Sequence, residues 1–131
     1  MRTKQMLLPA ALALLSAPGL MGALPAAAEA AGDAGKGRQI AIDHCSRCHV
    51  IADYNPYGGI GSTPSFQIMA RRDDYLERFQ TFFARRPHPV FVRVPGVPPP
   101  TDDPAFVATF EIQPEQVDDI VAFIEVLRAQ Q

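Results

Sequence analysis

The sequence predicts an all-α protein built as a single domain of about four helices. Apolar residues recur at three- and four-residue intervals in four separate segments, whereas no segment shows the clean alternation of a strand. Helix-capping residues or clusters of proline and glycine bound these segments. The chain has 131 residues, of which 47% are hydrophobic. It is long enough for one hydrophobic core but not for two.

The N-terminal segment, residues 1–30, has the features of a signal peptide. Two basic residues near the start precede an apolar run over residues 6–24, and small residues flank the expected cleavage site after Ala30. The alternative is an uncleaved membrane anchor, because the apolar run is nearly long enough to span a bilayer core of about 30 Å. Prolines and a glycine within the run favour cleavage.

The expected mature chain, residues 31–131, forms the single domain. The whole chain has 12 basic and 14 acidic residues, and the signal segment contains Arg2, Lys4 and Glu29, so the mature part carries a net charge of about −3. This charge argues against a nucleic-acid partner. The mature part has no second apolar span. We therefore expect a periplasmic protein with no transmembrane span after cleavage.

The first helix is expected over residues 34–47, with Asp33 as its N-cap. Residues 50–62 are expected to form a loop, because Asn55-Pro56 and a run of glycines interrupt any regular pattern.

The second helix is expected to be short, with Thr63 as its N-cap, Pro64 at its first position and its end near Arg71. A third helix is expected over residues 73–84. It has a largely aromatic face, which consists of Tyr75, Leu76, Phe79, Phe82 and Phe83.

Seven prolines between Pro87 and Gln113 exclude a continuous helix there and predict a long ordered loop. The last helix is expected to begin near Pro114 and to carry Arg128 near its end, where the helix dipole favours a cation. Its buried stripe comprises Val117, Ile120, Val121, Phe123, Ile124 and Leu127.

The chemistry-bearing motif is Cys45-Ser46-Arg47-Cys48-His49, which has the C-x-x-C-H pattern of covalent haem c attachment. Two thiols about one helical turn apart can reach the two vinyl groups on one side of a porphyrin. The histidine that follows can then bind the iron through one ring nitrogen and donate a hydrogen bond through the other. The motif predicts one haem c, attached through Cys45 and Cys48, with His49 as an iron ligand.

Two other readings of the cysteine pair remain open. A thioredoxin-type redox pair should open a helix after a strand, whereas this pair closes a helix in a chain predicted to be all-α. A structural zinc site needs four ligands, and beyond the motif only His44 and His88 are available.

The chain resembles the class I, or monohaem, c-type cytochromes over most of residues 33–127. The resemblance rests on Gly37 eight residues before Cys45, on the haem motif, on the Gly61-to-Phe66 segment and on the amphipathic last helix. It implies one cytochrome c-like haem domain. It also implies that Gly37 lets the last helix cross closely near Phe123, and that the carbonyl of Pro64 accepts a hydrogen bond from His49.

The second axial ligand is not evident. Many short relatives have His-Pro-Pro-Met-Pro where this chain has His88-Pro89-Val90-Phe91, so Phe91 stands at the methionine position. We expect a vacant or water-bound site or weak ligation by His88, and ready binding of carbon monoxide. Met69 is the remaining alternative, although core packing is its ordinary role.

The resemblance implies a protein that is not an enzyme and has no catalytic residues. It would carry single electrons between a periplasmic dehydrogenase or membrane complex and a downstream acceptor, so its partner would be a redox protein. Two alternatives stay open. One is a haem-based small-ligand binding or sensing protein with an open sixth iron position, and the other is a haem subunit docked to an enzyme through the loop over residues 87–113.

Overall fold

The computed structural model describes residues 32–131. The predicted signal peptide, residues 1–30, lies outside these residues. Within them the chain forms four α-helices, as predicted, with short π- and 3₁₀-helical segments. One two-stranded sheet departs from the all-α expectation, so the fold is mostly helical with little strand. None of the helices in residues 32–131 has the length and apolar character that a membrane crossing requires.

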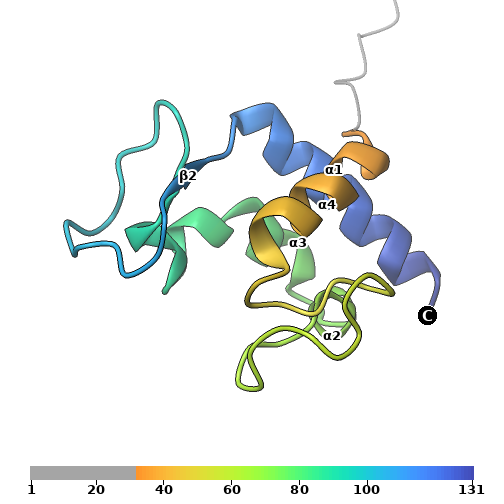
Figure 1. Cartoon of the computed structure of the whole chain (residues 1–131). Coiled ribbons are helices and arrows are strands. Elements are labelled where there is room, and N and C mark those ends of the chain that lie inside the picture. The colour runs from red at the N-terminus through yellow and green to blue at the C-terminus, as the bar shows by residue number, and fades with distance from the viewer. Residues whose placement is uncertain (1–31) are drawn as a thin grey trace, which may run out of the picture.

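The crossing of the first and last helices is the centre of the fold. Helices α1 (Ala34–Ile40) and α4 (Pro114–Ala129) form the most extensive interface between elements of the described chain, and Figure 1 shows them crossing. A Cβ atom at Gly37 would overlap the backbone carbonyl of Asp119, so only glycine permits this approach. The close contact therefore involves Asp119 and Ile120, about one turn before Phe123. The last helix therefore crosses Gly37 close to Phe123, as expected, while the Phe123 ring itself packs against Phe66.

The start of each of these helices agrees with the sequence analysis. Asp33 caps α1, since its carboxylate accepts hydrogen bonds from the backbone N–H groups of Gly35 and Lys36. Pro114 is the first residue of α4. The side chain of Gln116 accepts a hydrogen bond from the Gln113 N–H at 2.8 Å, which satisfies one donor at the helix start.

The helix before the cysteine motif is shorter and less regular than expected. After Ile40 it continues as a π-helical segment, η1 (Ala41–Cys45), and it ends at Cys45 rather than at Arg47. Residues 50–62 form turns, as predicted. The π-helical segment η1 thus ends at Cys45, the first residue of the cysteine motif.

Helix α2 (Phe66–Ala70) begins two residues later than expected. Ser65 caps it by accepting a hydrogen bond from the Ile68 N–H at 3.2 Å, so the predicted roles of Thr63 as the N-cap and Pro64 as the first helical residue are wrong. Because Pro64 precedes the helix, its carbonyl does not enter the helical hydrogen-bond ladder and stays available to another partner.

The aromatic third helix is split. Helix α3 (Tyr75–Gln80) ends before Thr81, and a 3₁₀ turn, η2 (Phe82–Ala84), follows. The Thr81 hydroxyl donates to the Glu77 carbonyl at 2.6 Å, and the backbone of Thr81 leaves helical geometry. Such side-chain bonds to the preceding turn compete with the helix, which explains the break that periodicity did not reveal.

The proline-rich stretch has more structure than the predicted loop. A 3₁₀ turn, η3 (His88–Val90), is followed by β1 (Val92–Arg93), which pairs in parallel with β2 (Phe110–Glu111). Val92 is opposite Phe110 and Arg93 is opposite Glu111. The loop between the two strands projects from the side of the molecule away from the C-terminus (Figure 1).

The hydrophobic core connects the helices with both loops. Five of the buried core residues lie on α4. The others come from α1, η1, the 50–62 loop, α2, α3, β1 and the residue after β2. The cluster comprises Ile40, Ala41, Ile51, Phe66, Ala70, Phe79, Val92, Ile112, Val117, Ile120, Phe123, Ile124 and Leu127. At its edge the Arg128 guanidinium donates to the Ala70 carbonyl at 2.6 Å and lies 4.4 Å from the centre of the Tyr75 ring.

Candidate functional site

The cysteine motif folds as a tight turn at the end of η1. The backbone N–H groups of His49 and Cys48 both donate to the carbonyl of Cys45, at 2.9 and 3.1 Å. This turn keeps the two thiols and the His49 ring on one short piece of chain. Both cysteines are half-buried and free.

Asn55 braces this turn, a role that the sequence analysis missed. Its amide nitrogen donates to the carbonyls of Ser46 and His49 at 2.9 and 3.0 Å, and its amide oxygen accepts from the Ile51 N–H at 2.7 Å. Asparagine side chains commonly satisfy nearby backbone groups in turns. The Asn55-Pro56 pair indicated a turn, but the sequence contained no signal that this turn closes over the motif.

Gly59 packs directly against the backbone of the motif. Its φ angle is +77°, and a Cβ there would lie 3.0 Å from the Cys48 carbonyl oxygen and 3.1 Å from the carbonyl carbon of His49. Both the positive φ and the close approach therefore require glycine.

We expect Gly59→Ala to lower the free energy of unfolding by about 2 kcal/mol, because it adds backbone strain and displaces the Cys48-His49 turn. Urea unfolding of the haem-bearing protein measures this change. Gly61→Ala is the matched control, since a Cβ at Gly61 would meet nothing within 4 Å and its φ is not positive. Equal stabilities of the two variants would contradict the assigned role of Gly59.

The His49 ring is held from behind by the segment before α2. Its Nδ1 atom lies 2.7 Å from the carbonyl oxygen of Pro64. Because a carbonyl only accepts, Nδ1 carries the proton and Nε2 keeps its lone pair. Burial lowers the pKa of His49, while the hydrogen bond to Pro64 opposes that shift. An edge-on contact with the Phe66 ring, at 5.4 Å between centroids, further fixes the imidazole.

The four predicted site residues line one cleft with a volume of about 600 Å³. This volume lies within the range of pockets that enclose small-molecule ligands. Its other walls come from the 50–62 loop, α2, α3, η2, η3, β2 with the loop before it, and α4. They include Ile60, Phe66, Met69, Phe79, Phe82, His88, Phe91, Phe106, Phe110 and Ile120. The cleft therefore combines two thiols and imidazole with a mainly apolar and aromatic lining.

The two other readings of the cysteine pair gain no support from the site. Burial, reinforced by the neighbouring Cys48, raises the pKa of Cys45 to about 12, whereas thioredoxin-type nucleophiles have lowered values. Over residues 32–131, no three or more His, Cys, Asp or Glu side chains are grouped so that they could hold a metal ion.

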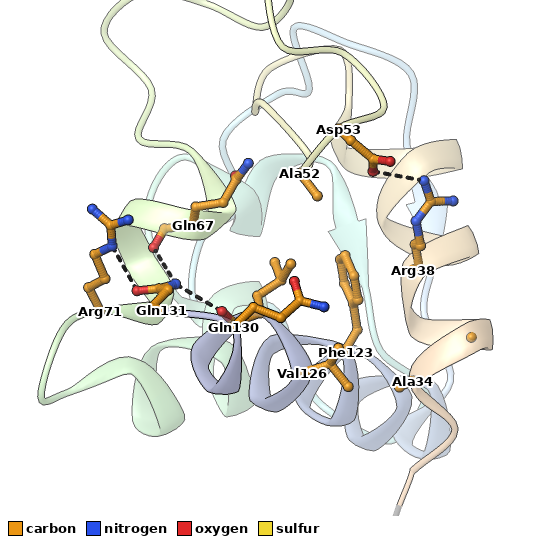
Figure 2. A pocket seen from close by; sticks show the side chains of 12 residues that line it. Ala34, Arg38, Ala52, Asp53, Gln67, Arg71, Phe123, Val126, Gln130 and Gln131 are labelled. Carbon is orange, nitrogen blue, oxygen red and sulfur yellow. Dashed lines mark hydrogen bonds and ion pairs between the residues drawn. The ribbon is translucent and has the colours of Figure 1, made fainter.

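A second hollow, of about 750 Å³, lies between α1, α2 and the end of α4, and Figure 2 shows its lining. None of the four predicted site residues lies on its wall. Its polar groups pair with one another: Arg38 with Asp53 at 3.2 Å, and Arg71 with Gln131 at 2.7 Å. These contacts fasten the C-terminus and the 50–62 loop to the helices.

The comparison with protein families identifies the domain. The family model for cytochrome c matches residues 34–128, which is most of the chain. The chain belongs to the cytochrome c family. Membership implies covalently bound haem, and the Cys45-to-His49 motif fits that attachment.

A relative among characterised proteins is cytochrome c-552 of Bradyrhizobium diazoefficiens, which is 37% identical over 68 residues. The matched region covers 52% of this chain and 62% of the relative. The chain thus spans about six tenths of the length of the curated relative that it matches. No solved structure matches the chain.

The cytochrome c cleft also contains each residue considered as a second axial ligand. Met69 lies on its wall but packs against the hydrophobic core, in agreement with its expected structural role. Phe91 lines the cleft from beside η3. His88 is half-buried on the same wall. Burial lowers the pKa of His88, and the Arg85 carbonyl opposes this shift.

Proposed function

We propose that this protein is an exported, periplasmic cytochrome c with a single haem, and that it carries single electrons between a periplasmic dehydrogenase or membrane complex and a downstream acceptor. The observation that carries the proposal is the position of the C-x-x-C-H turn on the wall of an apolar cleft, with His49 Nδ1 held 2.7 Å from Pro64 O. Export is inferred from residues 1–30, with cleavage after Ala30.

The residues of the cleft are suited to hold haem. Cys45 and Cys48 would form the two covalent bonds, and the His49 Nε2 lone pair is free to bind iron because Nδ1 faces Pro64. Pro64 is thus a positioning residue that fixes the ring and its tautomer. Haem, when bound, would supply the one-electron couple, and its ligands and burial would set the potential.

The mouth of the cleft supports transfer to a protein partner. Ile60 and Phe106 line the cleft, yet 51% and 68% of their surfaces are exposed. Exposed apolar residues beside a redox centre suit the small, transient interfaces of electron-transfer complexes. We assign no catalytic residue, and the partner itself is proposed only as a redox protein.

The first test is the covalent state of the protein purified from a periplasmic extract. We expect haem to stay on the polypeptide through acid-acetone extraction, and the intact mass to equal residues 31–131 plus one haem. Redox titration should give one reversible one-electron transition. Complete release of haem, a mass with two haems, or zinc at equal stoichiometry would contradict the proposal.

A further inference from the structure

The rings of His88 and His49 lie opposite one another in the cleft. Their centroids are 6.1 Å apart and their planes differ by only 8°. His88 begins η3, directly after the Arg86-Pro87 pair, whereas His49 ends the cysteine motif. Two segments that are far apart in sequence thus bring two imidazoles to the same space.

The same kind of backbone contact holds both rings. His88 Nδ1 lies 3.0 Å from the Arg85 carbonyl oxygen, and His49 Nδ1 lies 2.7 Å from that of Pro64. Each Nδ1 must carry the proton in these contacts, because a carbonyl can only accept. In both rings, therefore, Nε2 keeps the lone pair that a metal ion needs.

The spacing matches two imidazoles bound to opposite sides of one metal ion. A bond from a metal to an imidazole nitrogen is about 2 Å long, which puts the ring centre about 3 Å from the metal and two opposed ring centres about 6 Å apart. The observed separation is 6.1 Å. We propose that His88 is the second axial ligand, so that the iron of this cytochrome c is bound by two histidines. This inference rests on the proposed covalent haem.

Aromatic side chains hold the His88 ring in this position. Phe82 contacts it edge-on at 5.6 Å with an angle of 89°, and Phe91 does so at 5.7 Å with an angle of 66°. Phe91 occupies the place at which the resemblance led us to look for methionine. Here it supports the ligand three residues earlier in the chain instead of supplying one.

Ligation by His88 changes the expected behaviour toward small ligands. A small diatomic molecule would have to displace a ring that is already oriented by Arg85 and enclosed by Phe82 and Phe91. This argues against a sensing role and reverses the expectation of ready carbon monoxide binding. Histidine in place of methionine also predicts a lower reduction potential, because methionine ligation raises it.

The experiment uses the full chain exported with its haem attached, and a pyridine haemochrome spectrum first establishes attachment independently of the axial ligands. The ferric protein should be low-spin, without the near-infrared band of a methionine–iron bond. Because the ring planes are nearly parallel, its electron paramagnetic resonance spectrum should be rhombic. Carbon monoxide should bind to the ferrous protein at least tenfold more slowly than to the H88A variant.

Four variants complete the test. His88→Ala should give a high-spin ferric spectrum, and His88→Met should restore a methionine band and raise the potential. His44→Ala is the matched control, since His44 precedes Cys45 on the cleft wall and stacks on Phe110 at 4.5 Å. The spectrum of His44→Ala should match that of the wild-type protein, and so should the spectrum of Met69→Leu.

A high-spin wild-type protein, or an unchanged His88→Ala spectrum, would overturn the inference even with haem attached. A methionine band that disappears in Met69→Leu would also overturn it. Absence of attached haem would instead contradict the proposed function, so the two failures are distinguishable.

Discussion

Replacing Gly37 with alanine is expected to force α1 away from α4 and to lower the free energy of unfolding by about 3 kcal/mol. The added Cβ would overlap the Asp119 carbonyl and lie 2.9 Å from the Ile120 nitrogen, both of which belong to the backbone of a buried helix. A backbone carbonyl cannot rotate away as a side chain can. The strain therefore spreads into the largest interface of the described domain.

Gly35→Ala is the matched control, two residues away in the same helix. A Cβ at Gly35 would meet only the Asp33 carboxylate oxygen, at 3.2 Å. Alanine also favours the helix over glycine by up to about 1 kcal/mol, so this variant should be neutral or slightly stabilised. Denaturant unfolding of both haem-bearing variants measures the difference. A Gly37→Ala protein as stable as Gly35→Ala would show that the helices do not cross as described.

The features that the sequence predicted best are those that depend on interactions within a few residues. Asp33 caps α1 and Pro114 starts α4 because capping oxygens and a proline at the first helical position act within a few residues. The cysteine motif was recognisable for the same reason. Its two thiols and its histidine are close in sequence, so one short segment of chain can present all three to a single haem.

Features that depend on contacts between distant segments were not predictable in the same way. Thr63 was expected to be the N-cap of α2, but Ser65 takes that role. The start of the helix is fixed at Phe66, whose N–H donates to the distant Val50 carbonyl at 3.0 Å. Asn55 looked like an ordinary turn residue. Its hydrogen bonds to Ser46 and His49 become visible only once the loop is folded back over the motif.

His88 illustrates the same limit at the site itself. In the sequence it is one histidine at the start of the proline-rich 87–113 loop, 39 positions after His49. No local pattern indicates that η3 turns its ring toward the cleft, because that orientation depends on Arg85, Phe82 and Phe91 together. The unexpected phenylalanine at position 91 was visible in the sequence, but its packing against His88 was not.

Replacing Cys45 and Cys48 together by alanine is expected to reduce the yield of soluble protein roughly tenfold or more, since even a small loss of stability lowers cellular abundance several-fold. The 100 described residues enclose a cleft of about 600 Å³ with a largely apolar lining. A porphyrin bound in that cleft would contribute apolar surface that a small domain otherwise lacks. Without the thiols, haem can only bind reversibly, so its contribution depends on its free concentration.

The control for this variant is Ser46→Ala, which alters the same turn but keeps both thiols. The Ser46 carbonyl that Asn55 binds belongs to the backbone and is unaffected. This control should accumulate haem-bearing protein at the wild-type level. Soluble yield, circular dichroism and haem content after extraction compare the two proteins. A helical apoprotein that unfolds cooperatively, recovered from the double variant in good yield, would show that the polypeptide core is sufficient and that haem is not required for folding.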